Sequence, residues 1–499
     1  MTSNVSNPLL LPEIAQQVAS LSENRERLGL AYTCRQLFGS VIPFIWESLR
    51  GVKPIMSLIP GVKFVEEPIV SEYGSVHDVI THIIIGQNAL TEDWTRYWFY
   101  APFVKNIAPF VSYKRSYGET LRVQGWRFLF MKLNGVTLLP NLRSVDVERH
   151  NLSSCFDQLA WFALLLSPSL QFWYLGIIQW DYDSHDLPIP FNLLFGAISR
   201  YYSGNSSHTM PKRDEWYPSE RALTSICPNE YQEGLSWFVS TPAPINLRYL
   251  EIPLSPLTNV LWDELYTLGC LPFLEALVIC FAYAHDEAEH KFRNSKGPLP
   301  SNMFPCLQNL RLTMIPNVSL FRWIWELKPL VSGLSSTHIG GWEIGFDCET
   351  FASIVVQLLH KNSPNLVEFG CGFRVDSEGV ELLQAAYELL SVMPIKTLVL
   401  DGVDIGSFPP DYSENTFPHL RHLQLQAEYH AAGCSTYPKI AKAFPNLEYL
   451  YIDPLSYPNR CDPSNMNLEH TSFQSIEIYI PGIRLSNKKL DESTRKFRW

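Results

Sequence analysis

Apolar residues recur with a regular spacing along most of this chain of 499 residues. The clearest copy runs from Phe444 to Asp453, where a proline precedes apolar side chains at Leu447, Leu450 and Ile452. The pattern P-x-L-x-x-L-x-L/I ends in an alternation of apolar and polar positions, which predicts a short β-strand. Its leading apolar residues are Leu142, Leu170, Leu247, Leu274, Leu307, Leu366, Ile395, Leu420, Leu447 and Phe473.

Most intervals between these positions are 25 to 33 residues, and the outliers of 77 and 59 residues are close to three and two such intervals. A weaker copy at Leu334, Thr337 and Ile339 divides the longer gap before Leu366. A period of about 20 to 29 residues is typical of leucine-rich repeats, which stack as a solenoid. Helical spacing of apolar residues at 257–268 and 351–359 indicates a helix between strands, and the following proline ends it.

We therefore predict an α/β fold, with a leucine-rich-repeat solenoid over residues 136–485. It would be a horseshoe with a parallel sheet on the concave side and helices on the convex side. Residues 8–50 lack the repeat and predict a separate domain of three short helices. Pro12 stands in a first turn, residues 22–24 form a break, a longer helix passes through Leu28 and Phe38, and Pro43 interrupts near the end.

The N-terminal helices resemble an F-box. The segment Leu11 to Ile14 (LPEI), the stretch from Leu28 that ends in Cys34-Arg35, and the final Trp46 follow the order of that motif. The chain departs from it by one missing residue between Pro12 and Glu13 and by Thr33 in place of valine. Residues 93–107 are also similar to the segment after the F-box in many fungal F-box proteins with leucine-rich repeats. The resemblance implies binding to a Skp-family adaptor through Leu11, Pro12, Ile14, Val18, Leu28, Leu30, Cys34 and Ile42.

The alternative is that these helices only cover the open end of the solenoid, as terminal repeats do. Residues 51–135 are aromatic-rich and irregular, and we interpret them as a linker with degenerate repeats that contains strands at 76–85 and 103–107. The repeat register is lost between 176 and 243, where polar stretches predict surface loops. Residues 486–499 form a basic C-terminal tail.

Charge and cysteine usage indicate the kind of partner and the compartment. The net charge of −11 argues against nucleic-acid binding, which needs a basic face. The ten cysteines form no C-x-x-C pair, and the N-terminus lacks the basic region of a signal peptide. We expect a reducing compartment, cytoplasmic and/or nuclear. The uncharged stretch 160–180 is long enough to span a membrane, but it contains Pro168 and a repeat strand, so we expect no membrane association.

The sequence contains no nucleotide-binding glycine motif and no H-E-x-x-H zinc motif. His285 and His290 are five residues apart, off a common helical face, so a metal site is not predicted. We expect a protein that is not an enzyme and needs no cofactor. An enzyme that used one of the long loops would instead show a deep pocket lined by titratable groups.

The repeat strands predict a protein-binding surface, because residues between the leucines face outward. The outward positions of the last strands that we select for target binding are His422, Gln424, Tyr449, Tyr451, Asp453, Glu477 and Tyr479. With the F-box resemblance, this predicts a substrate receptor of a Skp–cullin–F-box ubiquitin ligase, which holds an unknown target protein near the ubiquitin-loaded enzyme. The alternative is a leucine-rich-repeat scaffold or inhibitor.

Overall fold

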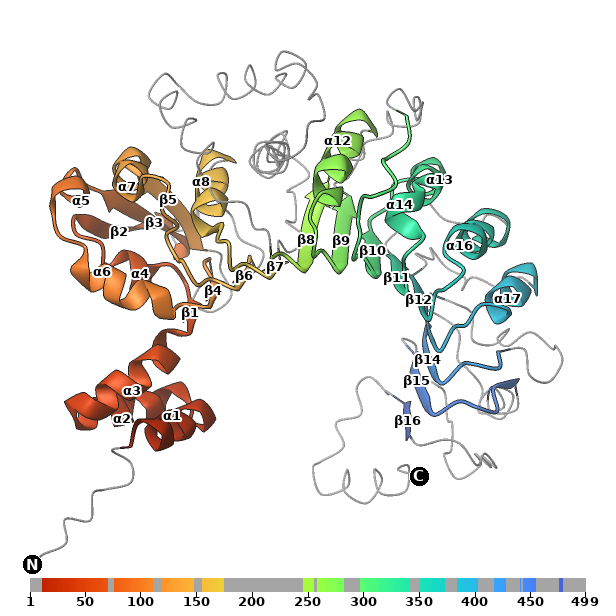
Figure 1. Cartoon of the computed structure of the whole chain (residues 1–499), viewed down its shortest axis with the longest axis horizontal. Helices are drawn as coiled ribbons and strands as arrows, with labels where there is room; N and C mark the ends of the chain where they lie inside the picture. The colour runs from red at the N-terminus through yellow and green to blue at the C-terminus, as the bar shows by residue number, and fades with distance from the viewer. Residues whose placement is uncertain are drawn as a thin grey trace, which may run out of the picture. The chain divides into compact units, whose positions relative to one another are not determined.

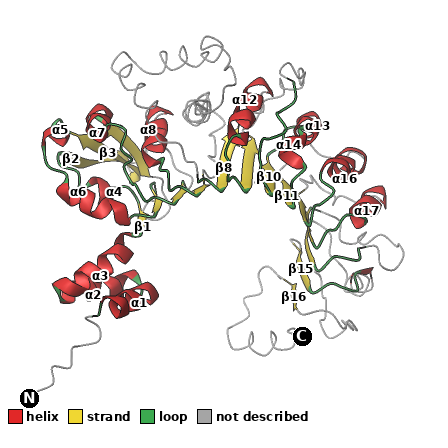
Figure 2. Ribbon diagram, viewed as in Figure 1, coloured by secondary structure: helices red, strands yellow, loops and turns green. Residues whose placement is uncertain are grey.

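The computed structural model describes residues 11–70, 76–110, 119–147, 155–174, 246–254, 258–281, 297–340, 351–372, 384–402, 417–427, 440, 443–454 and 475–478. The chain divides into two compact units. The first comprises Met1–Ile252 with Cys270–Phe273, and the second comprises Pro253–Gly269 with Leu274–Trp499. Helices and strands are labelled in Figure 1 and coloured by type in Figure 2.

The second unit contains a long sheet of parallel strands, each paired with the strand of the next copy of the pattern. The strands are β9 (Ala276–Phe281), β10 (Asn309–Thr313), β11 (Ser336–Gly340), β12 (Glu368–Gly372), β13 (Thr397–Asp401), β14 (His422–Ala427), β15 (Tyr449–Pro454) and β16 (Ser475–Ile478). The repeated leucines are buried: Leu366, Leu420 and Leu447 are each 0% exposed. Each of these leading leucines is therefore buried two residues before its strand begins.

The weak copy at residues 334–339 also forms a strand, β11. Its middle position is a threonine instead of leucine, and Thr337 is only 2% exposed. The Thr337 hydroxyl donates a hydrogen bond to the carbonyl oxygen of Leu310 over 2.8 Å, which satisfies the polar group inside the sheet.

Helices connect the strands of the second unit. They are α12 (Thr258–Gly269), α13 (Val318–Glu326), α14 (Lys328–Val331), the π-helical turn η6 (Phe351–Val356), α16 (Gln357–Asn362) and α17 (Gln384–Ser391). Figure 2 shows α13, α16 and α17 on the same side of the parallel strands. The helices predicted at 257–268 and 351–359 are present, and the second begins with a π-helical turn.

The first unit has its own parallel strands, in the order β1, β4, β6, β7, β8. They are β1 (Ser48–Arg50), β4 (Asn106–Ala108), β6 (Ser144–Asp146), β7 (Phe172–Tyr174) and β8 (Tyr249–Leu254). Short helices accompany them: α4 (Lys53–Met56), α5 (Asn88–Thr91), α6 (Thr95–Tyr100), η2 (Ala101–Phe103), α7 (Trp126–Leu133) and α8 (Cys155–Leu165).

A second, three-stranded sheet corrects our interpretation of residues 51–135 as degenerate repeats. Strand β3 (Val76–Ile85) is present, but it pairs antiparallel with β2 (Val62–Val70) and parallel with β5 (Glu119–Gln124). Strands β2 and β3 are longer than the repeat strands, and adjacent strands joined by a short connection pair readily as an antiparallel hairpin. Of this segment, β4 belongs to the parallel sheet, where it lies between β1 and β6.

Three helices open the described chain: α1 (Pro12–Leu21), α2 (Asn24–Thr33) and α3 (Arg35–Trp46). The single longer helix that we expected through Cys34 is divided there, because Cys34 has an extended backbone. Pro43 lies inside α3 and does not end it. The protein is thus a mixed α/β chain with a long parallel sheet, preceded by three helices. No helix among the described residues is long and apolar enough to cross a membrane.

Candidate protein-binding surfaces

The three N-terminal helices share a small hydrophobic core. Its centre consists of Ala19, Ala31 and Val41, one from each helix. Partly buried side chains pack around this centre: Leu30, Phe38, Phe44 and Ile45. Because each helix contributes to one common core, α1–α3 form a module that is held together by its own contacts.

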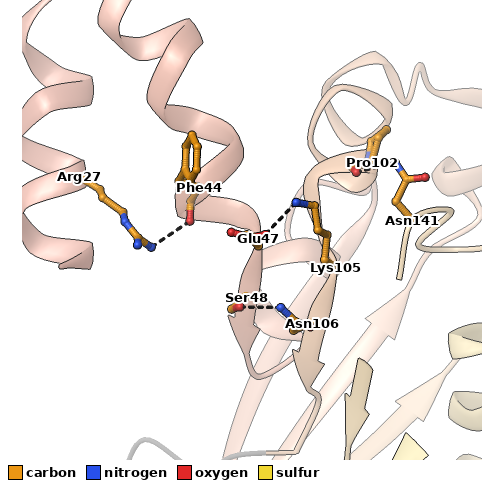
Figure 3. A network of polar contacts seen from close by, with 8 residues as sticks. All are labelled: Arg27, Phe44, Glu47, Ser48, Pro102, Lys105, Asn106 and Asn141. Carbon is orange, nitrogen blue, oxygen red and sulfur yellow. Dashed lines mark hydrogen bonds and ion pairs between the residues drawn. The ribbon is translucent and has the colours of Figure 1, made fainter. Parts of the chain in front are cut away.

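Arg27 connects the same three helices through polar contacts. Its Nε donates a hydrogen bond to the carbonyl oxygen of Ala19 on α1 over 2.7 Å, and its Nη1 donates to the carbonyl oxygen of Phe44 on α3 over 3.3 Å. Figure 3 shows the second contact. The guanidinium thereby donates to carbonyl oxygens on α1 and α3 and holds these two helices in position relative to α2.

Helix α1 buries its small residues and exposes its large apolar ones. Ala15 and Ala19 are 2% and 0% exposed, whereas Ile14, Leu21 and the N-cap residue Leu11 are 36%, 83% and 50% exposed. Positions 11, 14, 18 and 21 are spaced by three or four residues, so they share one side of the helix. An amphipathic helix ordinarily turns its large apolar residues toward the core of its own chain. In α1 these residues instead form an outer apolar face.

The other predicted adaptor-binding residues differ in exposure. Leu28 on α2 is 42% exposed, and Pro12 and Cys34 are also exposed. Leu30 is half-buried against the common core. Ile42 is 5% exposed, so this side chain belongs to the interior and is removed from the outer face.

Two exposed apolar residues on α1 and α2 were missed by sequence reasoning. Leu21 follows Ile14 and Val18 at helical spacing, and this spacing could have identified it as a residue on the same side of the helix. Tyr32 is 84% exposed and lies four residues after Leu28 on α2. We define the N-terminal apolar surface as Leu11, Ile14, Val18, Leu21, Leu28 and Tyr32.

The end of α3 is attached to the first strands of the parallel sheet. Lys105 Nζ lies 2.8 Å from Glu47 Oε1, and Asn106 Nδ2 donates to Ser48 Oγ over 3.0 Å (Figure 3). The rings of Trp46 and Tyr100 pack with centroids 4.5 Å apart. The terminal tryptophan of the predicted motif therefore contacts the segment that follows it.

The predicted target-binding residues of β14 and β15 face outward where the structure describes them. Leu423 and Leu425 on β14 are 0% exposed, whereas His422, the first residue of that strand, is exposed and Gln424 is half-buried. Tyr449 and Tyr451 are half-buried, and the rings of His422 and Tyr449 have centroids 6.0 Å apart. For Asp453 and Glu477 only the backbone is described, and Tyr479 lies outside the described residues.

In another part of the same sheet, a histidine ring lies over a glycine on the neighbouring strand. His338 on β11 is in register with Gly370 on β12, and its ring covers that glycine. A β-carbon added at Gly370 would lie 2.1 Å from His338 Nδ1. Burial, and secondarily the nearby Arg311, lowers the pKa of His338 to about 4. The imidazole is therefore neutral near pH 7.

The titratable groups form no cluster suited to a metal ion among the residues that the structure describes. No group of three or more His, Cys, Asp or Glu side chains there is arranged to hold a metal ion. His285 and His290 lie outside the described residues.

Glu264 on α12 is 6% exposed, and its Oε2 has no hydrogen-bond partner. Burial, and secondarily Asp263, raises the pKa of Glu264 to about 8. This carboxyl faces the core with Leu261, Leu265 and Leu268, which are each 0% exposed.

Comparisons with known proteins identify no family. No protein-family model matches the chain, and no curated protein matches it. Among solved structures, the chain is similar to CroV588, described as a novel circular leucine-rich-repeat protein, with 10% sequence identity and a TM-score of 0.22. The match covers 76% of this chain, which spans about half of the length of that protein.

Proposed function

We propose that the protein is a substrate receptor of a Skp–cullin–F-box ubiquitin ligase, with α1–α3 bound to a Skp-family adaptor and a target protein held on the parallel sheet. The observation that carries the proposal is the reversed packing of α1, with alanines inside and large apolar residues outside. Burying a leucine side chain contributes about 1.5–3 kcal/mol. An apolar face that the chain leaves exposed is therefore suited to binding another protein.

The separate core of α1–α3 also favours this function over a mere end cap. A cap exists to cover the apolar end of the repeats, whereas these helices have a core of their own and expose large apolar side chains. In the proposed complex the receptor makes and breaks no covalent bond. It raises the effective concentration of target lysines near the ubiquitin-loaded enzyme.

The test is co-purification of the full chain with a recombinant Skp-family adaptor. Leu11→Asp and Leu28→Asp each place a charge on an exposed apolar position, so neither disturbs the core. We expect both variants to lose the adaptor, because a carboxylate would have to be buried in the complex. Met131→Asp is the matched control, since Met131 is 65% exposed and lies on α7. Wild-type protein that fails to bind the adaptor, or variants that bind it as the control does, would support the scaffold alternative.

A further inference from the structure

An aromatic and acidic surface lies on the parallel strands of the first unit, away from the residues that the sequence singled out. Side by side on β6, β7 and β8, the apolar side chains of Val145, Trp173 and Leu250 point inward and are 0%, 2% and 2% exposed. The alternate residues of these strands face outward. They are Ser144, Asp146, Phe172, Tyr174, Tyr249 and Glu251, which we call the β6–β8 surface.

Two tyrosine rings form the centre of the β6–β8 surface. Tyr174 and Tyr249 pack with ring centroids 4.5 Å apart and planes inclined by 36°. Phe172 is in register with Tyr249 and is 36% exposed. Tyr174 and Tyr249 are half-buried, so part of each ring is accessible to a partner, while their mutual packing holds them in place at little further entropic cost.

Carboxylates flank the rings on both sides. The strand register pairs Tyr174 with Asp146 on β6 and with Glu251 on β8. Asp146 is exposed and Glu251 is half-buried. The Tyr249 hydroxyl donates to Glu251 Oε2 over 3.2 Å, which orients that carboxylate beside the rings.

This arrangement selects the charge of a partner. The faces of aromatic rings attract cations, and the two carboxylates add to that attraction and repel anions. Arg143 and Arg248 immediately precede β6 and β8, whereas Asp146 and Glu251 are in register with Tyr174, the last residue of β7. A cationic group would therefore settle at the carboxyl end of β7, over Tyr174.

We propose that the β6–β8 surface binds a basic segment of a partner protein, with a lysine or arginine side chain placed on the rings of Tyr174 and Tyr249 between Asp146 and Glu251. Arginine fits this position especially well, because its planar guanidinium stacks on rings while it donates to carboxylates. The site does not depend on the proposed ubiquitin-ligase function, since it requires neither α1–α3 nor an adaptor.

The test measures binding of a fluorescent ten-residue peptide of alternating arginine and serine to the full chain, at physiological ionic strength. The same peptide with glutamate in place of arginine is the charge control. We expect the arginine peptide to bind and the glutamate peptide not to bind. Tyr174→Leu should weaken binding about fivefold, because it keeps apolar area but removes the ring, whereas Tyr174→Phe should stay within about twofold.

A matched pair of charge variants separates this site from general attraction to an acidic protein. Asp146→Asn should weaken binding about threefold. Glu368→Gln removes the same charge from an exposed position on β12 and should leave binding unchanged. Equal losses in these two variants, unchanged binding by Tyr174→Leu in a protein with wild-type thermal unfolding, or no binding by the wild type would each overturn the proposal. Leu11→Asp should bind the peptide normally, which distinguishes this site from the adaptor-binding surface.

Discussion

Asn446 donates a hydrogen bond from its side-chain Nδ2 to the carbonyl oxygen of Pro418, 3.0 Å away in the neighbouring copy of the repeat. The same contact recurs elsewhere: Asn141 donates to Pro102, and Asn246 donates to Pro168, both over 2.8 Å. In each case the asparagine directly precedes the buried leading leucine. The side chain thus joins one copy to the next at the start of the strand, where the backbone pairing begins.

We expect Asn446→Ala to destabilise the protein by about 1 kcal/mol, the usual net contribution of one hydrogen bond. Chemical denaturation followed by circular dichroism measures this loss. Asn365 precedes Leu366 at the same position of another copy but makes no such bond among the described residues, so Asn365→Ala is the control. Equal effects of the two substitutions would show that the loss does not come from the contact with Pro418.

Gly125 should be indispensable for the junction between the three-stranded sheet and α7. Its backbone has φ of 85°, in the left-handed region, and an added β-carbon would lie 2.2 Å from the carbonyl oxygen of Ile85. Because the opposing atom belongs to the backbone of β3, it cannot rotate away. We expect Gly125→Ala to lower the free energy of unfolding by about 3 kcal/mol, measured by thermal or chemical denaturation.

Gly29 provides the opposite case. It lies inside α2 with nothing within 4 Å of an added β-carbon. Gly29→Ala should stabilise the helix by about 0.5–1 kcal/mol. If Gly125→Ala were as harmless as this control, the strained conformation at Gly125 would be contradicted.

The repeat strands were predictable from sequence because one local pattern determines each of them. A strand begins within a few residues of each of the leading residues Leu366, Leu420 and Leu447. The same pattern also predicted β11, through Leu334. The three-stranded sheet was not predictable in this way. The pairing of Val62–Val70 with Val76–Ile85 in an independent sheet depends on contacts outside the repeat period, which periodicity does not report.

For the candidate surfaces, too, the sequence identified residues that are close together in the chain, but it did not predict positions that depend on packing between distant elements. The F-box resemblance identified Leu11, Ile14 and Val18, and their spacing in the sequence places them on one side of α1. The inward position of Ile42 follows from the packing of α3 against its neighbours, which the sequence pattern does not contain. Similarly, the pairing of Tyr174 with Tyr249 joins strands that are far apart in the chain, across a stretch where the repeat register is lost.

Glu264 should make the protein less stable at alkaline pH. Its pKa is about 8 in the folded chain, against an ordinary value of 4.5, chiefly because burial disfavours the charged carboxylate. Unfolding therefore releases this proton between these two values, and the stability that depends on the protonated carboxyl declines as pH rises from 4.5 to 8.

We expect Glu264→Gln to raise the melting temperature more at pH 9 than at pH 5, because glutamine has a similar shape and no ionisable proton. Thermal unfolding at the two pH values measures the difference. Asp263→Asn at the adjacent, half-buried position is the control and should produce a much smaller pH-dependent gain. An equal gain from Glu264→Gln at both pH values would show that the carboxyl does not change its ionisation on unfolding.

His338 should limit stability at acidic pH, with the opposite sign. Its folded pKa of about 4 lies below the ordinary 6.5, because burial and then Arg311 disfavour the imidazolium. The unfolded chain takes up a proton at a higher pH than the folded chain does. The contribution of neutral His338 is therefore fully present above pH 6.5 and is lost as pH falls toward 4. We expect His338→Gln to reduce the decline in melting temperature over this range, whereas replacement of the exposed His419 by glutamine should reduce it less. If the two variants showed the same pH profile, the environment of His338 over Gly370 would not be the cause of the acid sensitivity.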